Sequence, residues 1–178
     1  MKHLPAALYI VAVLVANYTA VWFIPFPVFG QVAVGTLVFG IVFTLRDKMH
    51  RNGRRYVYGV IALTALLMAL ESLFLAVPVR IIIASLIAIV LSETADTEVY
   101  QRVIRRSWYT RVAASNAVSI PLDSIVFNLI AFAGVFPWPV LASIVFGEIV
   151  VKALTSGGVA LWKSSIVTPQ TGAAPLSQ

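Results

Sequence analysis

Residues 112–133, VAASNAVSIPLDSIVFNLIAFA, form an apolar run that carries one acidic residue, Asp123, near its middle. About 20 predominantly apolar residues are needed to cross the hydrocarbon core of a bilayer as a helix. A charge at that depth costs on the order of 3 kcal/mol on insertion scales, so it requires a partner or a purpose. The segment therefore predicts a transmembrane helix with a functional polar face.

Five further apolar runs lie around this one, at residues 4–24, 28–45, 56–77, 80–100 and 140–162. The 178 residues are 60% hydrophobic and 11% charged, with a mean hydropathy of +0.94. A soluble domain carries about 25% charged residues. The sequence predicts an all-α polytopic membrane protein, a bundle of six transmembrane helices in one domain (residues 1–168), and a disordered polar tail (residues 169–178).

Basic residues set the expected orientation, because Lys and Arg concentrate in cytoplasmic connections. One side of the predicted topology has only Arg80, and the other has Lys2, Arg46, Lys48, Arg51, Arg54, Arg55, Arg102, Arg105, Arg106 and Arg111. Both termini are therefore expected to be cytoplasmic. The net charge of +6 lies in these short clusters, so the sequence does not indicate nucleic-acid binding.

Polar residues in the fifth predicted helix share one face. Asn116 and Asp123 are two turns apart, and Ser119 lies between them on the same stripe. Ser and Asn also hold membrane helices together, so packing is an alternative role for Ser119. Pro121 removes one backbone hydrogen bond and can open this helix locally.

Charged residues in the fourth and sixth predicted helices extend this polar group. Glu93 and Asp96 lie on neighbouring positions of one face, and Glu148 precedes Lys152 by one helical turn. The Glu148–Lys152 pair could only neutralise itself, or Lys152 could also engage a substrate or a carboxylate of another helix. Glu71, in the third helix, has no role that the sequence can rank.

A short pattern recurs in the fourth and fifth predicted helices. Ser92 precedes Asp96, and Ser119 precedes Asp123, with three residues between them in both pairs. If this similarity is structural, the two helices present similar polar faces to a shared space. Gly35, Gly40, Gly157 and Gly158 are interpreted as sites of close helix packing.

Several function classes are disfavoured. The chain has no cysteine, which excludes disulfides and cysteine-ligated metals, and His3 and His50 have no partner at metal-binding spacing. No phosphate-binding loop, dinucleotide fingerprint or nucleophile–base arrangement is present. We therefore expect neither an enzyme nor a bound cofactor or metal, and the oligomeric state stays open.

Four stretches resemble the signatures of the VUT family, the bacterial inner-membrane proteins known as queuosine precursor transporters. They are residues 83–96, the basic hinge at 102–111, the run from Ser115-Asn116 through Asp123-Ser124 to Phe127, and residues 151–154. The resemblance covers about residues 80–155. Asp47, before Arg51-Asn52-Gly53, is similar to the acidic, glycine-ended segment that follows the family's second helix, without its usual second acidic residue.

The resemblance implies uptake of a nucleobase-like molecule, a deazaguanine base such as preQ0 or preQ1, across a bacterial inner membrane. A guanine-like edge has adjacent N–H donors, which a buried carboxylate of Glu93, Asp96 or Asp123 can accept. Asn116 would add mixed donors and acceptors, and Phe127 a stacking surface. An alternative that also fits six helices is the substrate-binding membrane subunit of an ATP-driven vitamin importer.

Overall fold

The structure, a computed structural model, describes residues 3–26, 30–75 and 77–166. The predicted tail at residues 169–178 lies outside this part of the chain. The described elements follow in the order α1 (Leu4–Tyr18), β1 (Phe23–Phe26), β2 (Gly30–Ala33), α2 (Val34–Met49), the short 3-10 turn η1 (His50–Asn52), α3 (Arg54–Leu75), α4 (Val79–Arg102), α5 (Trp108–Phe132) and α6 (Trp138–Ile166).

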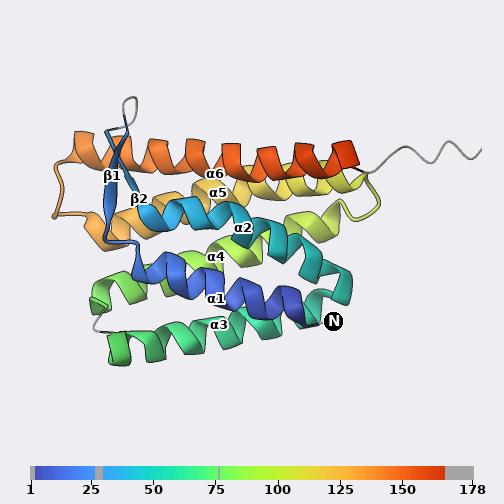
Figure 1. Cartoon of the computed structure of the whole chain (residues 1–178), viewed down its shortest axis with the longest axis horizontal. Helices are drawn as coiled ribbons and strands as arrows, with labels where there is room; N and C mark the ends of the chain where they lie inside the picture. Colours follow the sequence, from blue (N-terminus) through green and yellow to red (C-terminus); the bar gives the residue numbers. More distant parts are fainter. Residues whose placement is uncertain (1–2, 27–29, 76, 167–178) are drawn as a thin grey trace, which may run out of the picture.

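The six α-helices lie alongside one another in a single bundle (Figure 1). α1 begins at the end of the bundle where α2 connects to α3 and α4 connects to α5, and the β-hairpin lies at the opposite end. The predicted helical class and number of helices are confirmed for the described residues. Within the described residues, two spans, Trp108–Phe132 and Trp138–Gly158, are long and apolar enough to cross a membrane, and Leu4–Tyr18 and Val34–Arg46 are shorter apolar helices.

The connection between the first two helices differs from the prediction. Instead of helices over residues 4–24 and 28–45 joined by a turn, α1 ends at Tyr18 and an antiparallel hairpin follows, with Ile24 opposite Val32. Pro25 excludes helix at Ile24 and Pro25, because proline lacks an N–H donor and disfavours helical geometry in the residue before it, but it does not account for the end of α1 at Tyr18. The backbone N–H of Val34 donates to the Trp22 carbonyl (2.7 Å), which joins the hairpin to the start of α2.

Glycine permits one close approach between helices. A Cβ atom on Gly35 would lie 2.2 Å from the carbonyl oxygen of Ala16, so only glycine fits where α2 crosses α1. The predicted packing role is confirmed for Gly35. It is wrong for Gly157 and Gly158, because a Cβ atom on either residue would meet no other atom within 4 Å. The surroundings of Gly40 are not among those that the structure describes.

The α5 helix is continuous through Pro121, so the expected local opening is not observed. Its C-terminal end is tied to α4 by Arg80. The Arg80 guanidinium donates to the carbonyls of Ile130 (2.7 Å) and Ala133 (2.6 Å), which satisfies backbone acceptors that a helix end leaves without partners. This contact fixes the start of α4 against the end of α5.

Apolar side chains form two clusters in the described part of the bundle. One joins α1, α2 and α3 around Tyr9, Met49 and Met68, and the other joins α4, α5 and α6 around Phe132 and Leu141. Buried polar and charged side chains from α2, α4, α5 and α6 form a separate group. That group is the most unusual feature of this apolar bundle.

Candidate functional site

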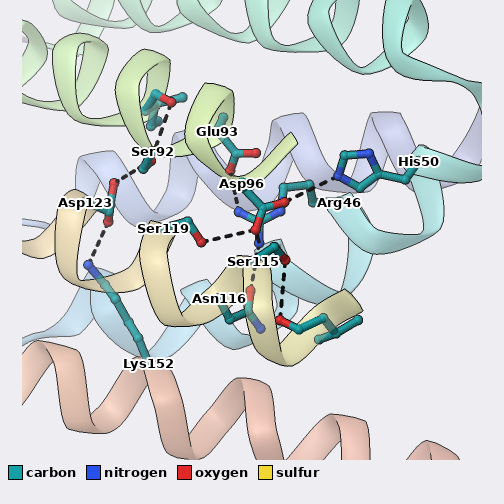
Figure 2. Close-up of polar contacts among 12 residues, drawn as sticks. Arg46, His50, Ser92, Glu93, Asp96, Ser115, Asn116, Ser119, Asp123 and Lys152 are labelled. Carbon is teal, nitrogen blue, oxygen red and sulfur yellow. Dashed lines mark hydrogen bonds and ion pairs between the residues drawn. The ribbon is translucent and has the colours of Figure 1, made fainter. Parts of the chain in front are cut away.

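Lys152, on α6, is the centre of the first buried charged group (Figure 2). Its ammonium donates to Asp123 Oδ2 (2.8 Å), Glu148 Oε2 (3.2 Å) and Ser124 Oγ (3.1 Å), and it lies 4.6 Å from the ring centroid of Phe39. The predicted pairing of Glu148 with Lys152 is confirmed. So is the alternative in which Lys152 also reaches a carboxylate on another helix.

Asn128, on α5, completes this Lys152 group, and sequence reasoning missed it. Its side-chain Nδ2 donates to Glu148 Oε2 (3.0 Å) and to the carbonyl of Ser124 (2.8 Å). Ser124 and Asn128 are one turn apart in an apolar helix, and this spacing is the signal that could have identified both.

Arg46, on α2, is the centre of a second buried charged group. Its guanidinium contacts Glu93 Oε1 (3.2 Å), Asp96 Oδ1 (2.7 Å) and Asn116 Oδ1 (2.8 Å), and it lies 4.8 Å from the ring centroid of Phe43. The prediction that Arg46 belongs to a cytoplasmic connection is wrong, because α2 continues to Met49 and buries this side chain completely. The side chain of Asp47 lies outside the described part of the chain.

His50 and Ser119 also belong to the Arg46 group. His50 Nε2 lies 3.4 Å from Asp96 Oδ2, and its ring stacks on Tyr100 with the centroids 4.3 Å apart. Ser119 donates to Asp96 Oδ1 (3.2 Å). Sequence reasoning missed this carboxylate partner of His50, because η1 turns the side chain back into the bundle.

The two groups are built in the same way, as Figure 2 shows between α4 and α5. Ser119 of α5 donates to Asp96 of α4, and Ser92 of α4 donates to Asp123 of α5 (3.3 Å). In each group, the aspartate that accepts from the serine also binds a cation from a flanking helix: Arg46 binds Asp96, and Lys152 binds Asp123. The recurring sequence pattern therefore corresponds to similar polar faces of α4 and α5 that contact each other directly.

The described charges of these groups do not balance. Two cations, Arg46 and Lys152, face four buried carboxylates, so four minus two leaves an excess of two negative charges when all are ionised and His50 is neutral. The carboxylates are those of Glu93, Asp96, Asp123 and Glu148. Buried charge without compensation is costly, so this interior favours a proton or a cationic group of a ligand. No group of three or more described His, Asp or Glu residues is placed to hold a metal ion.

A cavity lies beside the Lys152 group. In this conformation the cavity is small, about 30 Å³, with room for a few water molecules, so it must widen to hold a ligand. It is lined by residues of α1, β2, α2, α4, α5 and α6. Four of the predicted site residues line it: Asp123, Phe127, Glu148 and Lys152. The other four, Glu93, Asp96, Asn116 and Ser119, surround Arg46 instead.

Neutral polar side chains form another part of the cavity wall. Asn17 of α1 and Ser85 of α4 both line the cavity, and Ser85 donates to Asn17 Oδ1 (2.5 Å). Asn17 Nδ2 in turn donates to Glu71 Oε2 (2.9 Å), which gives Glu71 a defined partner. Sequence reasoning missed Asn17 because it lies near the end of an apolar helix, where an amide is common.

Comparison with known proteins matches residues 55–162, well over half of the chain, to the family described as "Putative vitamin uptake transporter". A relative from Bacillus subtilis (strain 168), named "Probable queuosine precursor transporter", is 33% identical over 93 residues, which cover 49% of this chain and 40% of the relative. The alignment thus spans less than half the length of that relative. No solved structure matches the chain significantly. The chain belongs to the vitamin uptake transporter family.

Proposed function

We propose that this chain is a multi-pass transporter of the bacterial inner membrane that takes up a queuosine precursor, a deazaguanine base such as preQ0 or preQ1. All six helices cross the membrane in this proposal, and both termini are cytoplasmic. Membership of the vitamin uptake transporter family and the name of the Bacillus subtilis relative support it. The alternating ends of the helices in the bundle agree with the proposed crossings.

The observation that carries the proposal is the buried Lys152 group beside a cavity. Lys152, Asp123 and Glu148 are each at least 95% buried, yet all three line this cavity. Charged side chains are rarely kept inside an apolar bundle unless they form a path or a site for a solute. A polar solute that crosses the bilayer needs partners of this kind.

The chemistry of a deazaguanine suits this wall. Its exocyclic amino group has two N–H donors, and the carboxylates of Asp123 and Glu148 are acceptors. Each carboxylate oxygen can accept more than one hydrogen bond, so the contacts with Lys152 leave capacity for a ligand. Phe127 would stack on the heterocycle, and the excess of negative charge favours a base that carries an aminomethyl cation.

We place Glu93, Asp96, Asn116 and Ser119 in the same path, as a second station around Arg46. The similar construction of the two groups supports this. α4 runs from Ser85, at the cavity, through Glu93 to Asp96, toward the end of the bundle where α1 begins. In the proposed orientation that end is cytoplasmic. The ligand reaches this station when the Arg46 contacts open.

The test is uptake of a labelled deazaguanine base by cells that cannot make queuosine. Cells that express the parent chain should accumulate the base, and Asp123→Asn and Lys152→Ala should abolish uptake at matched membrane abundance. Thr155→Val is the control, because Thr155 on α6 donates to carbonyls of its own helix (2.8 Å and 3.1 Å) and should retain uptake. Absence of uptake by a well-inserted parent chain would reject the substrate. Uptake only with an added ATPase partner would favour the importer-subunit alternative.

A further inference from the structure

We infer that Asn17 selects ligands with a lactam edge, a ring carbonyl next to a ring N–H, and that Glu71 is the positioning residue that fixes the Asn17 amide. This inference rests on the proposed function, because it takes the cavity beside Lys152 as the ligand site. Neither residue lies in the group of charges that binds Lys152, and Asn17 lies outside the region matched to the family.

The location of Asn17 places it within reach of a ligand in the cavity. Asn17 and Ser85 line the same cavity as Asp123, Glu148 and Lys152, so neutral and charged parts of the wall surround one space. A deazaguanine whose exocyclic amino group is held by the carboxylates would therefore present the adjacent ring N–H and carbonyl to the neutral polar groups. The Asn17 amide is the group in this neutral part that offers both donors and an acceptor.

The two protein partners of Asn17 determine which way its amide faces. An ionised carboxylate can only accept hydrogen bonds, so the atom that contacts Glu71 must be the amide nitrogen. The hydroxyl of Ser85 donates to the amide oxygen on the other side. Since rotation of the amide by 180° would bring the amide oxygen against the Glu71 carboxylate, this network holds one orientation.

The fixed amide has capacity left for a ligand. A side-chain amide has two N–H donors and two acceptor positions, and the contacts with Glu71 and Ser85 use one of each. One donor and one acceptor remain, and they complement the carbonyl and N–H of a lactam. A ligand anchored by the carboxylates cannot turn over, so an amino heterocycle with the reverse order of donor and acceptor would leave buried groups unpaired.

The first experiment needs no ligand. The chain has no cysteine, so Asn17→Cys introduces a unique thiol. We expect a small, water-soluble thiol reagent to label this variant in intact cells and to leave Thr64→Cys unlabelled. Thr64 is fully buried and donates to a carbonyl of its own helix (2.8 Å). If the Asn17→Cys variant is well inserted and stays unlabelled, the inference is overturned.

The second experiment measures selectivity with the purified chain. We expect the parent to bind 7-deazaguanine at least about tenfold more tightly than 7-deazaadenine. Glu71→Gln lets the amide turn and should bring the ratio toward one, and Asn17→Ala, which removes both the donor and the acceptor, should do the same. Thr64→Val should keep the parental ratio, because a loss of packing on α3 weakens both ligands alike.

The two failures are distinguishable. If the parent binds neither heterocycle, the proposed substrate fails and the lactam assignment fails with it. If the parent binds 7-deazaguanine and the ratio is unchanged in Glu71→Gln and Asn17→Ala, the proposed function stands and the roles of Asn17 and Glu71 are rejected.

Discussion

Lys152 shows how a buried cation is accommodated in an apolar bundle. Its ammonium has three donors, and the three have partners on α5 and α6 in Asp123, Ser124 and Glu148. Arg46 is accommodated in a similar way, because its planar guanidinium contacts carboxylates of α4 and the Asn116 side chain of α5. Each cation therefore holds helices together and keeps carboxylates in place.

The first prediction concerns Arg46. Arg46→Met should lower the free energy of unfolding by about 3–5 kcal/mol, because Glu93 and Asp96 would remain buried without their cation. The measurement is thermal and denaturant unfolding of the purified protein in detergent. Combining Arg46→Met with Glu93→Gln and Asp96→Asn should restore most of the stability but not uptake, since the removed charge is then no longer needed for folding. Arg46→Met with parental stability would contradict this account.

Sequence reasoning identified the residues whose charge lies far inside an apolar run. Asp123, Glu148 and Lys152 are of this kind, and all three line the cavity. Arg46 and His50 were missed because they lie where an apolar run meets a basic segment. A difference of one turn in the end of α2 decides whether such a residue faces water or the core. Whether any of these residues binds a ligand stays a prediction.

At the scale of elements, α4 and α5 exchange hydrogen bonds between equivalent positions. Ser92 should be coupled to Asp123, and Ser119 to Asp96, by about 1 kcal/mol or more, because hydrogen bonds to charged groups contribute about 1.5–3 kcal/mol. A double-mutant cycle with Ser92→Ala and Asp123→Asn measures the first coupling from unfolding free energies. Ser92→Ala paired with Asp96→Asn is the control and should be nearly additive. Equal coupling in both cycles would argue against the exchange.

A second element-scale prediction concerns the contact between α1 and α2. Gly35→Ala should lower the free energy of unfolding by about 1–3 kcal/mol, because its Cβ would meet backbone of Ala16 that cannot move without a shift of α1. Gly59→Ala on α3 is the matched control, since nothing lies within 4 Å of its Cβ position. It should leave stability unchanged or raise it by about 0.5–1 kcal/mol. The thermal unfolding midpoints of both variants in detergent provide the test, and equal midpoints would contradict the account.

The helices were predictable and the hairpin was not. Apolar length identifies each helix, because few other structures bury so many consecutive apolar residues. Residues 19–33 are also apolar, so hydropathy alone extends the flanking helices through them. Pro25 predicts a break in the helix, but α1 already ends at Tyr18, and proline does not reveal whether a turn or a paired strand follows.

At the scale of the whole molecule, the proposed topology makes opposite ends of the bundle face opposite sides of the membrane. Val135→Cys, in the exposed connection between α5 and α6, should react with an impermeant thiol reagent in intact cells. Arg105→Cys, in the exposed connection between α4 and α5, should react only after the membrane is permeabilised. The parent has no cysteine and is an unlabelled control. The reverse pattern would invert the proposed orientation.

The central claim is that this chain alone moves a deazaguanine base across a membrane. The most direct measurement is uptake of the labelled base into liposomes that contain only the purified chain. The account predicts time-dependent accumulation above that of empty liposomes, its loss in Asp123→Asn, and its retention in Thr155→Val. Uptake no greater than in empty liposomes, with the protein correctly folded and inserted, would contradict it.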